Sequence, residues 1–355
     1  MSATTTLEQQ ETPAALERLV QVFNDGSIAI LCGIGYDTGL FDTLATLPPA
    51  TSHQVADAAG LDERYVREWL GGMAAAGFVD YDSDSRTYAL CPEHAPFLTG
   101  PTADNLARSM RLVSFMGQVA PLVVEHFRIG GGLTYEESPG FHVGQAEESA
   151  AVHDGSLIDR IIPLTGLVGR LQEGIEVADI GCGQGHAINL LAREFPRSTF
   201  TGYDLSGETV AVGRAEAHEW GLGNATFVEC DVARPIHSAA FDLVTAFDAI
   251  HDQAHPATVL ANVHTALRTG GTFLMVDIKA SSHLERNFDL PWASFLYAIS
   301  ISHCMSVSLG QGGDGLGTVW GVELAERMLK DAGFATVDLH ELEEDPFNAY
   351  FVART

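Results

Sequence analysis

Three closely spaced glycines, Gly181, Gly183 and Gly185, lie between a short apolar run and a segment with helical spacing. The apolar run, Ile175–Ile180, predicts a buried strand, and Ala187–Phe195 predicts a helix. Glycine permits a sharp turn between the two and leaves room for a ligand where a Cβ atom would collide. The first turn of the helix adds unpaired N–H groups that face the same crevice. The stretch therefore predicts a loop that binds a nucleotide-like molecule.

Two acidic residues accompany this loop. Asp179 lies within the predicted strand, and Asp204 ends the next apolar run, Phe200–Asp204. An acidic side chain at the end of that strand can accept hydrogen bonds from both hydroxyl groups of a ribose. Dinucleotide-binding loops have the spacing Gly-x-Gly-x-x-Gly, whereas this loop reads Gly-x-Gly-x-Gly. The spacing argues against a dinucleotide, and an ordinary glycine-rich turn beside a surface aspartate stays open as the alternative.

The segment Asp179–Gly185 resembles motif I of class I methyltransferases, which use S-adenosylmethionine (SAM). It carries the pattern of that motif, an acidic residue followed by three alternating glycines. The resemblance implies that SAM is the cofactor and that S-adenosylhomocysteine (SAH) is the product. It also implies that the loop surrounds the methionine part and the ribose of SAM.

The same resemblance predicts further cofactor contacts. In the family, an acidic residue after the third strand accepts a hydrogen bond from the adenine amino group, and the next backbone N–H binds the ring. Asp231 and Val232 follow the predicted strand Ala225–Glu229, although a turn or a helix cap is the alternative for Asp231. The cofactor-binding residues predicted in this way are Asp179, Gly181, Gly183, Gly185, Asp204, Leu205, Asp231, Val232 and Phe247.

A second polar group, Asp248-Ala-Ile-His251-Asp252, follows the fourth predicted strand, Phe241–Phe247. It resembles the His-Asp-Trp region of winged-helix O-methyltransferases, in which the histidine is the general base that deprotonates the acceptor hydroxyl. The resemblance assigns this role to His251, and histidine suits it because its ordinary pKa lies near neutral pH. Gln253 stands where the family has tryptophan, and Asp252 is the nearest candidate to orient the imidazole. The alternative is that His251 only lines the cofactor pocket or caps a helix.

Strand and helix patterns alternate from residue 175 onward, which predicts a parallel sheet with helices on both faces. Thr272–Asp277 predicts a fifth strand, and Ala335–Leu342 and Asn348–Ala353 predict two more. The predicted fold class is therefore α/β, a Rossmann-like, seven-stranded methyltransferase sheet; its final antiparallel hairpin is implied by the resemblance. Ligands bind at the carboxyl ends of such strands, where three of the aspartates above fall.

The N-terminal part predicts a helix-turn-helix followed by a hairpin, which is a winged helix. Two helices are predicted first, over 14–33 and 37–44. Thr51–Gly60 and Asp62–Gly72 predict the two short helices, and Gly77–Tyr81 and Thr87–Leu90 predict the hairpin strands. Such a domain either binds DNA or, in front of O-methyltransferases, mediates dimerisation. The recognition helix and the wing carry more acidic than basic side chains, whereas a DNA-binding face needs net positive charge. Nucleic-acid binding is therefore disfavoured, and a homodimer through this domain is implied by the resemblance.

These patterns divide the chain into four predicted parts. They are a disordered arm over 1–13, an N-terminal α-helical winged-helix domain of the dimerisation type over 14–100, a helical connection over 101–172 and the SAM-binding domain over 173–355. Within the connection, helices are predicted over 105–127, 141–149 and 150–171.

Two segments are expected near the acceptor. The resemblance suggests that the connection forms a wall of the acceptor pocket and that Tyr135, Phe141 and His142 face the ligand, although Phe141 could equally pack in the core. The segment 279–321 predicts a cap over the active site, and its glycine-rich part, 311–321, predicts either a closing loop or an exposed hairpin tip.

Composition limits the partners and the compartment. The 355 residues include 47 acidic and 19 basic side chains, so the formal net charge is −28. Such a surface repels phosphate backbones and anionic bilayers. The five cysteines lack a Cys-x-x-Cys pair and predict reduced thiols in a cytoplasmic protein, and the scattered histidines predict no metal site. The apolar stretch 290–309 is long enough to span a bilayer, but it predicts a buried or lid helix.

Residues 14–355 as a whole resemble a winged-helix SAM methyltransferase, within a bacterial branch that includes mycobacterial members. The resemblance implies methyl transfer to a small-molecule acceptor, through a hydroxyl group, with His251 and Asp252 as catalytic residues. One alternative is transfer to sulfur, nitrogen or carbon; a thiol ionises closer to neutral pH and needs less help from a base. The other alternative is a regulator that binds SAM and DNA.

Overall fold

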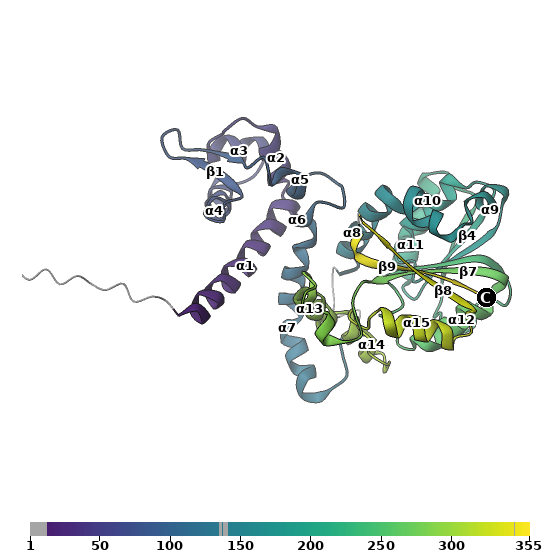
Figure 1. The fold of residues 1–355 in the computed structure, drawn as a ribbon. Coiled ribbons are helices and arrows are strands. Elements are labelled where there is room, and N and C mark those ends of the chain that lie inside the picture. Colours follow the sequence, from purple (N-terminus) through teal and green to yellow (C-terminus); the bar gives the residue numbers. More distant parts are fainter. Residues whose placement is uncertain (1–12, 135–136, 138–140, 344) are drawn as a thin grey trace, which may run out of the picture. The chain divides into compact units, whose positions relative to one another are not determined.

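The structure is a computed structural model, and it describes residues 13–134, 137, 141–343 and 345–355. The chain divides into two compact units, Met1–Ser114 and Phe115–Thr355, each with its own hydrophobic core (Figure 1). Almost all of the predicted N-terminal arm, as well as Tyr135, lies outside the described residues.

The first unit is a winged helix. Thr51 and Gln54 form a reciprocal capping box at the start of α3, and the Asp62 side chain caps α4. An antiparallel hairpin, β1–β2, follows, as the sequence predicts. The elements are α1 (Ala14–Asp37), α2 (Leu40–Thr46), α3 (Ser52–Ala59), α4 (Glu63–Ala75), β1 (Val79–Asp82), β2 (Thr87–Leu90), α5 (Ala95–Leu98) and α6 (Leu106–Ser109).

Helix α1 is longer than the predicted helix over 14–33 and continues to Asp37. Gly35 is needed inside it, because a Cβ at this position would lie 2.5 Å from the Phe41 ring and 2.6 Å from the Trp69 ring. The helix predicted over 37–44 starts later, at Leu40, because Gly39 adopts φ +68° and interrupts the chain.

The connection between the winged helix and the sheet is more broken than predicted. A continuous helix was predicted over 150–171, but Pro163 and the left-handed Gly166 (φ +72°) interrupt it. The observed elements after α6 are α7 (Arg111–Ile129), α8 (Phe141–Ser156), the π-helical turn η2 (Leu157–Ile161), the 3₁₀ turn η3 (Ile162–Thr165) and α9 (Val168–Glu173).

The second unit contains the predicted seven-stranded α/β sheet. Its order is β5-β4-β3-β6-β7-β9-β8, with β9 antiparallel to both of its neighbours. The strands are β3 (Glu176–Ile180), β4 (Thr199–Asp204), β5 (Ala225–Glu229), β6 (Phe241–Phe247), β7 (Leu267–Ile278), β8 (Thr336–Leu342) and β9 (Asp345–Arg354).

Helices cover both faces of this sheet. One apolar cluster joins α10 and α11 to the sheet, and a second joins α12 and α15 to it. Strands β3 and β6 are parallel neighbours, and the chain continues from β3 toward one edge of the sheet and from β6 toward the other. Such a switch point opens a crevice at the carboxyl ends of the strands. The remaining elements are α10 (His186–Glu194), α11 (Gly207–Glu219), α12 (Pro256–Ala266), η4 (Leu284–Arg286), α13 (Ala293–Ser302), α14 (Cys304–Gly310) and α15 (Val322–Asp331).

Two helical segments among the described residues pass a length-and-composition test for crossing a membrane, Ala14–Asp37 and Ala293–Gly310. Half of the tested window in Ala293–Gly310 is buried inside the protein, as expected for a core helix. Only 17% of the window in Ala14–Asp37 is buried, so this helix presents a largely exposed apolar surface.

Candidate active site

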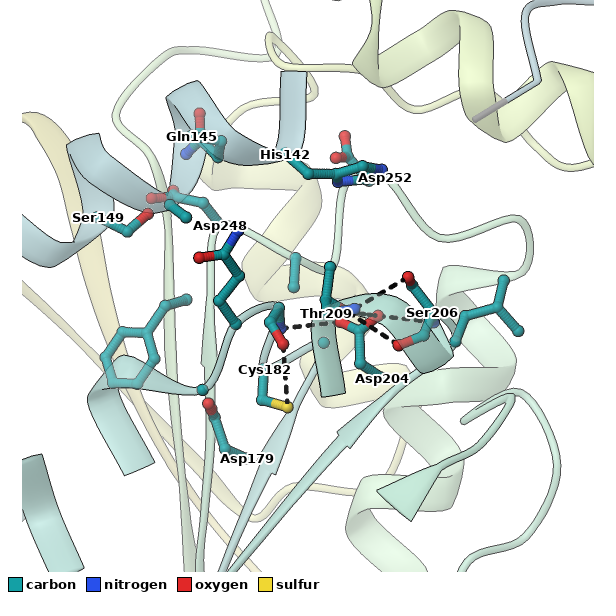
Figure 2. A pocket seen from close by; sticks show the side chains of 18 of the residues that line it. His142, Gln145, Ser149, Asp179, Cys182, Asp204, Ser206, Thr209, Asp248 and Asp252 are labelled. Carbon is teal, nitrogen blue, oxygen red and sulfur yellow. Dashed lines mark hydrogen bonds between the residues drawn. The ribbon is translucent and has the colours of Figure 1, made fainter. Parts of the chain in front are cut away.

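A cavity of about 530 Å³ lies at the switch point of the sheet. The glycine loop after β3, the residue at the end of β4 and the segment after β6 all contribute to its lining. Figure 2 shows Asp179, Cys182 and Asp204 in its lower part and Gln145, His142 and Asp252 in its upper part. Its size falls in the range typical of small-ligand sites.

The backbone of the glycine loop is hydrogen-bonded to strand β4 and lines the cavity. The amides of Gly181 and Cys182 both donate to the Tyr203 carbonyl oxygen, at 2.8 and 3.0 Å. At Gly185 a Cβ would collide with the Phe227 ring, whereas at Gly183 nothing lies within 4 Å of the Cβ position. All three glycines have positive φ angles. Glycine is therefore needed at position 185 because of close packing, whereas at position 183 it leaves open space in which a ligand could approach the backbone.

Asp204 holds this loop in place. Its Oδ2 accepts a hydrogen bond from the Gly183 amide at 2.8 Å, and its Oδ1 accepts from the Ser206 amide at 2.9 Å and the Thr209 hydroxyl at 3.2 Å. Leu205 lines the cavity beside it. The sequence did not point to Ser206 or Thr209, because a serine and a threonine at a helix start are common as caps.

Asp231, Val232 and Phe247 also line the cavity. Asp231 in addition accepts a hydrogen bond from the Ala233 amide at 3.0 Å, so the turn-capping role named as its alternative is present as well. The Phe247 ring packs edge-on against His153, with 4.7 Å between centroids. His153 was not predicted; burial lowers its pKa to about 4 and keeps the imidazole neutral.

Asp179 is a buried carboxyl behind the loop. It accepts a hydrogen bond from the Thr245 hydroxyl at 2.7 Å. Burial raises its pKa to about 7, because a charge would be poorly solvated there. Asp248, which the sequence placed only near the crevice, lines the cavity in a left-handed conformation (φ +49°). Burial and the Asp277 carboxylate raise the pKa of Asp248 to about 8.

His251 lies beneath the cavity and is not among its lining residues; only 3% of its surface is exposed. Its Nδ1 bonds to Asp277 Oδ1 at 2.8 Å, and its Nε2 lies 3.2 Å from Asp252 Oδ1. The Trp320 indole donates to the same Asp277 oxygen at 2.8 Å. Burial opposes a charge on His251, but the Asp277 and Asp252 carboxylates outweigh it and raise its pKa well above the ordinary value.

The carboxylate that is hydrogen-bonded to His251 is therefore Asp277, near the end of β7; Oδ1 of the predicted Asp252 lies close to the ring but accepts no hydrogen bond among the described residues. Asp252 does line the cavity. Asp277 and Trp320 were missed because they lie far from His251 in sequence, and nothing local marks them as its partners.

Helix α8 and the predicted cap supply the opposite wall. Phe141 and His142 line the cavity, as the resemblance suggests, and so do Gln145 and Ser149 of the same helix (Figure 2). From the glycine-rich stretch, Gln311 lines the cavity. The Asp314 amide donates to the Ala254 carbonyl at 2.8 Å, which ties this stretch to the segment after His251.

Two family models match the chain. Residues 26–100 match the Rv2258c-like winged HTH domain, and residues 171–307 match the methyltransferase domain. The chain thus combines a region similar to a winged HTH domain with a region similar to a methyltransferase domain. The site fits SAM, the cofactor predicted from motif I: Gly183 leaves open backbone beside an acidic side chain that is already oriented.

The curated relatives are matched over only part of their length. A fatty-acid O-methyltransferase from Mycolicibacterium smegmatis is 33% identical over 108 residues, which are 30% of this chain and 38% of the relative. A trans-aconitate 2-methyltransferase from Afipia carboxidovorans is 36% identical over 74 residues, 21% of this chain and 27% of the relative. The chain thus spans well under half the length of either relative.

Solved structures match the whole fold at low identity. An O-methyltransferase family protein from Burkholderia thailandensis has a TM-score of 0.70 at 16% identity, covering 97% of this chain and 98% of that one. Human N-acetylserotonin methyltransferase, solved with SAM, has a TM-score of 0.68 at 16% identity, covering 98% and 99%. The chain therefore shares the fold of these structures over almost its whole length.

Proposed function

We propose that this protein transfers the methyl group of SAM to a hydroxyl group of a small molecule. One observation carries the proposal: the SAM-type loop ordered by Asp204 lines the same cavity as Asp252, the lining member of the carboxylate–histidine cluster Asp277–His251–Asp252. SAM, when bound, supplies an electrophilic methyl group. The protein aligns the acceptor with that methyl group and provides a base that can remove the proton of the acceptor hydroxyl.

The predicted cofactor residues have distinct tasks in this proposal. The open backbone at Gly183 approaches the cofactor, and the Asp204 carboxylate accepts hydrogen bonds from the ribose hydroxyls. Asp231 and Val232 lie where the adenine is expected, and Phe247 provides an apolar surface. Gly181, Gly185, Asp179 and Leu205 shape the loop around these contacts.

The cluster under the acceptor end supports a hydroxyl acceptor. An aromatic hydroxyl ionises near pH 10, so its methylation at neutral pH benefits from a nearby base. His251 is the candidate general base named from the resemblance, and Asp252 is the member of its cluster that faces the cavity. A thiol acceptor is the second candidate, because it would need this cluster less.

Carboxylic acids are a further acceptor class, since two curated relatives are named for fatty acids and trans-aconitate. Among the described residues that line the cavity there is no lysine or arginine. A carboxylate acceptor would therefore lack the cationic partner that usually orients it. This favours a hydroxyl over a carboxylate.

The proposal is tested with purified protein, SAM and matched acceptors of one size: a phenol, a thiophenol and a benzoic acid. SAH release and the mass of the product are measured. We expect the phenol to be methylated in preference to the benzoic acid. Preferred methylation of the acid, or failure to bind SAM at all, would contradict the proposed function.

We further propose that the protein is a cytoplasmic homodimer and does not bind nucleic acid. The recognition helix α4 carries Glu63 and Glu68 beside its two arginines, and the wing is acidic, which disfavours DNA. The apolar side chains exposed on α1 favour a second copy of the chain as partner: Leu16, Leu19, Val20, Val22, Phe23, Ile30 and Ile34.

The double variant Leu19→Glu/Phe23→Glu is expected to convert this dimer into a monomer. Phe23 is 78% exposed in the single chain, so burying it against a partner is favourable and placing a charge there opposes association. Molar mass from light scattering checks the result, and Asn24→Glu controls for added charge on the same helix. A monomeric wild-type protein would contradict the proposed dimer.

A further inference from the structure

Cys304 is a buried thiol at the acceptor end that the proposed reaction does not use. It is the first residue of α14, directly after the break in the helix at His303 (φ −145°, ψ −80°). The fold brings its side chain next to His251 and Asp252, which belong to the segment after β6. Cys304 lies far from these two residues in the sequence, which predicted no metal site.

Three different ligand atoms converge at this point. One atom each from His251, Asp252 and Cys304 lies within 4.8 Å of the other two. An imidazole nitrogen, a carboxylate oxygen and a thiolate sulfur are the atoms that Zn²⁺ binds in proteins. Tetrahedral zinc, with bonds of about 2.0–2.3 Å, holds neighbouring ligand atoms about 3.3–3.8 Å apart. A movement of roughly 1 Å therefore suffices to bring the whole ligand set, His251–Asp252–Cys304, to this spacing.

The contact between His251 and Asp252 already has the spacing of two metal ligands. His251 Nε2 lies 3.2 Å from Asp252 Oδ1, close to the length of one edge of such a tetrahedron. Yet this oxygen is buried and accepts no hydrogen bond among the described residues. An unpaired, buried carboxylate oxygen is costly, and a cation bound between the oxygen and the ring nitrogen removes that cost.

Asp277 gives His251 the support that a metal-bound histidine usually has. Its Oδ1 bonds to His251 Nδ1 at 2.8 Å, and the Trp320 indole donates to the same oxygen. A metal-binding histidine almost always donates its other ring N–H to a carboxylate, a carbonyl or a water, which orients the ring and makes the ligating nitrogen more basic. With Nδ1 bonded to Asp277, Nε2 is the nitrogen that is left for the metal, and it lies on the side of Asp252.

The charges of the ligand set are suited to a dication. Burial and the Asp252 carboxylate raise the pKa of Cys304 to about 11, although His251 opposes them, so the thiol keeps its proton in the absence of a metal. A bound metal ion deprotonates a coordinating thiol outright. When a charged His251 and the Cys304 thiol each lose a proton to solvent and one Zn²⁺ enters, the net charge of the buried group stays the same. Zinc binding therefore buries no additional charge.

We propose that His251, Asp252 and Cys304 form a zinc site, and that bound Zn²⁺ inhibits methyl transfer by occupying the nitrogen of the candidate base. The Zn–N, Zn–O and Zn–S bonds form, the Cys304 S–H bond breaks, and its proton goes to solvent. Asp252 borders the cavity, which gives the metal a path of entry and a water molecule as its fourth ligand (Figure 2). The zinc site stands on its own geometry, whereas the inhibition rests on the proposed function.

The site is tested with Co²⁺, which takes the ligands of Zn²⁺ but absorbs light. Chelator-treated, full-length protein is titrated with Co²⁺, and the thiolate-to-cobalt charge-transfer band is followed in the near ultraviolet. We expect one Co²⁺ per chain, displacement by Zn²⁺, and loss of the band in Cys304→Ser. Cys230→Ser is the matched control, because Cys230 lines the cavity but lies outside the ligand set. No band in the wild type, or a band that persists in Cys304→Ser, would overturn the proposal.

A second variant covers the case in which Cys304→Ser does not fold. Asp252 is partly exposed, so Asp252→Asn is expected to leave the fold intact, which circular dichroism checks. We expect it to weaken Co²⁺ binding by at least about tenfold, because even the loss of a group behind a metal ligand costs about 10–100-fold in affinity. Unchanged affinity in Asp252→Asn would contradict the proposed site.

Inhibition is measured with SAM and the phenolic acceptor. Saturating Zn²⁺ is expected to lower kcat by about 10²–10⁴-fold, the usual range for losing a general base, whereas Mg²⁺ has no effect because it prefers oxygen ligands. Each protein is compared with its own metal-free rate, and an equal fall in Cys304→Ser would mean that Zn²⁺ acts elsewhere. If no acceptor is methylated, the proposed function fails, while the cobalt spectrum still decides the zinc site, so the two failures are distinguishable.

Discussion

An Asp204→Ala variant is expected to bind SAM at least about 100-fold more weakly than the wild-type protein. The carboxylate is expected to accept hydrogen bonds from the cofactor ribose, and hydrogen bonds to a charged group contribute roughly 1.5–3 kcal/mol each. Two such bonds correspond to about 10²–10⁴-fold in affinity. Asp204 also holds the Gly183 amide at 2.8 Å, so its removal releases the loop that surrounds the ligand.

Two further variants separate these contributions. Asp204→Asn keeps an oxygen that can accept from Gly183 but removes the charge, so an intermediate affinity is expected. Asp231→Ala should cost only about tenfold, since a single hydrogen bond to the cofactor is lost. Isothermal titration with SAM and SAH gives the affinities, with NADH as a negative control and thermal unfolding as a check of the fold. Unchanged SAM binding by Asp204→Ala would show that the glycine loop is not the cofactor site.

The sheet could be predicted from sequence because its signals are local. The central strands are buried on both faces, so they appear as continuous apolar runs; Phe241–Phe247 was predicted with the bounds that β6 has. The glycine loop was equally clear, because positive φ angles and close packing restrict those positions to one residue type. The bounds failed where packing overrides local preference, as in α1, which runs through Gly33 and Gly35.

The acceptor end could not be predicted in the same way, because its residues meet only in three dimensions. His251 was found through a motif, yet its partners Asp277 and Trp320 come from β7 and the segment before α15. His303, which lines the cavity, lies in the apolar, serine-rich segment 293–309, which has no proline or glycine to mark the break between α13 and α14. Such contacts depend on the tertiary fold and leave no periodic trace in the sequence.

The second large effect concerns stability. An Asp277→Ala variant is expected to lower the free energy of unfolding by about 3–5 kcal/mol, the range for removing one partner of a buried ion pair. The substitution removes the carboxylate that is hydrogen-bonded to His251, and it removes the oxygen that accepts the hydrogen bond of the Trp320 indole. Asp277→Asn retains an oxygen for Trp320 and should cost less. Urea unfolding followed by circular dichroism measures both.

The pH dependence of the free energy of unfolding tests the contribution of the His251 charge. Its pKa is raised in the folded protein, so its contribution is complete below the unfolded pKa, near 6.5, and is lost as the pH rises through the higher folded pKa. Asp179 and Asp248, with folded pKa values of about 7 and about 8, add a loss of stability over the range from about pH 4 to 8. The Asp277 carboxylate also raises the pKa of Asp248, so the difference in slope between wild type and Asp277→Ala reports both groups, and a His251→Gln variant is needed to separate them.

We therefore expect wild-type stability to fall more steeply than that of Asp277→Ala between pH 6 and pH 9, so that the two proteins differ more at pH 6 than at pH 9. His251→Gln should show the same shallower slope, because it removes the titrating group itself. Parallel slopes in all three proteins would mean that His251 does not carry a proton between the two carboxylates. In that event a nitrogen of His251 would be available as the base for the acceptor hydroxyl.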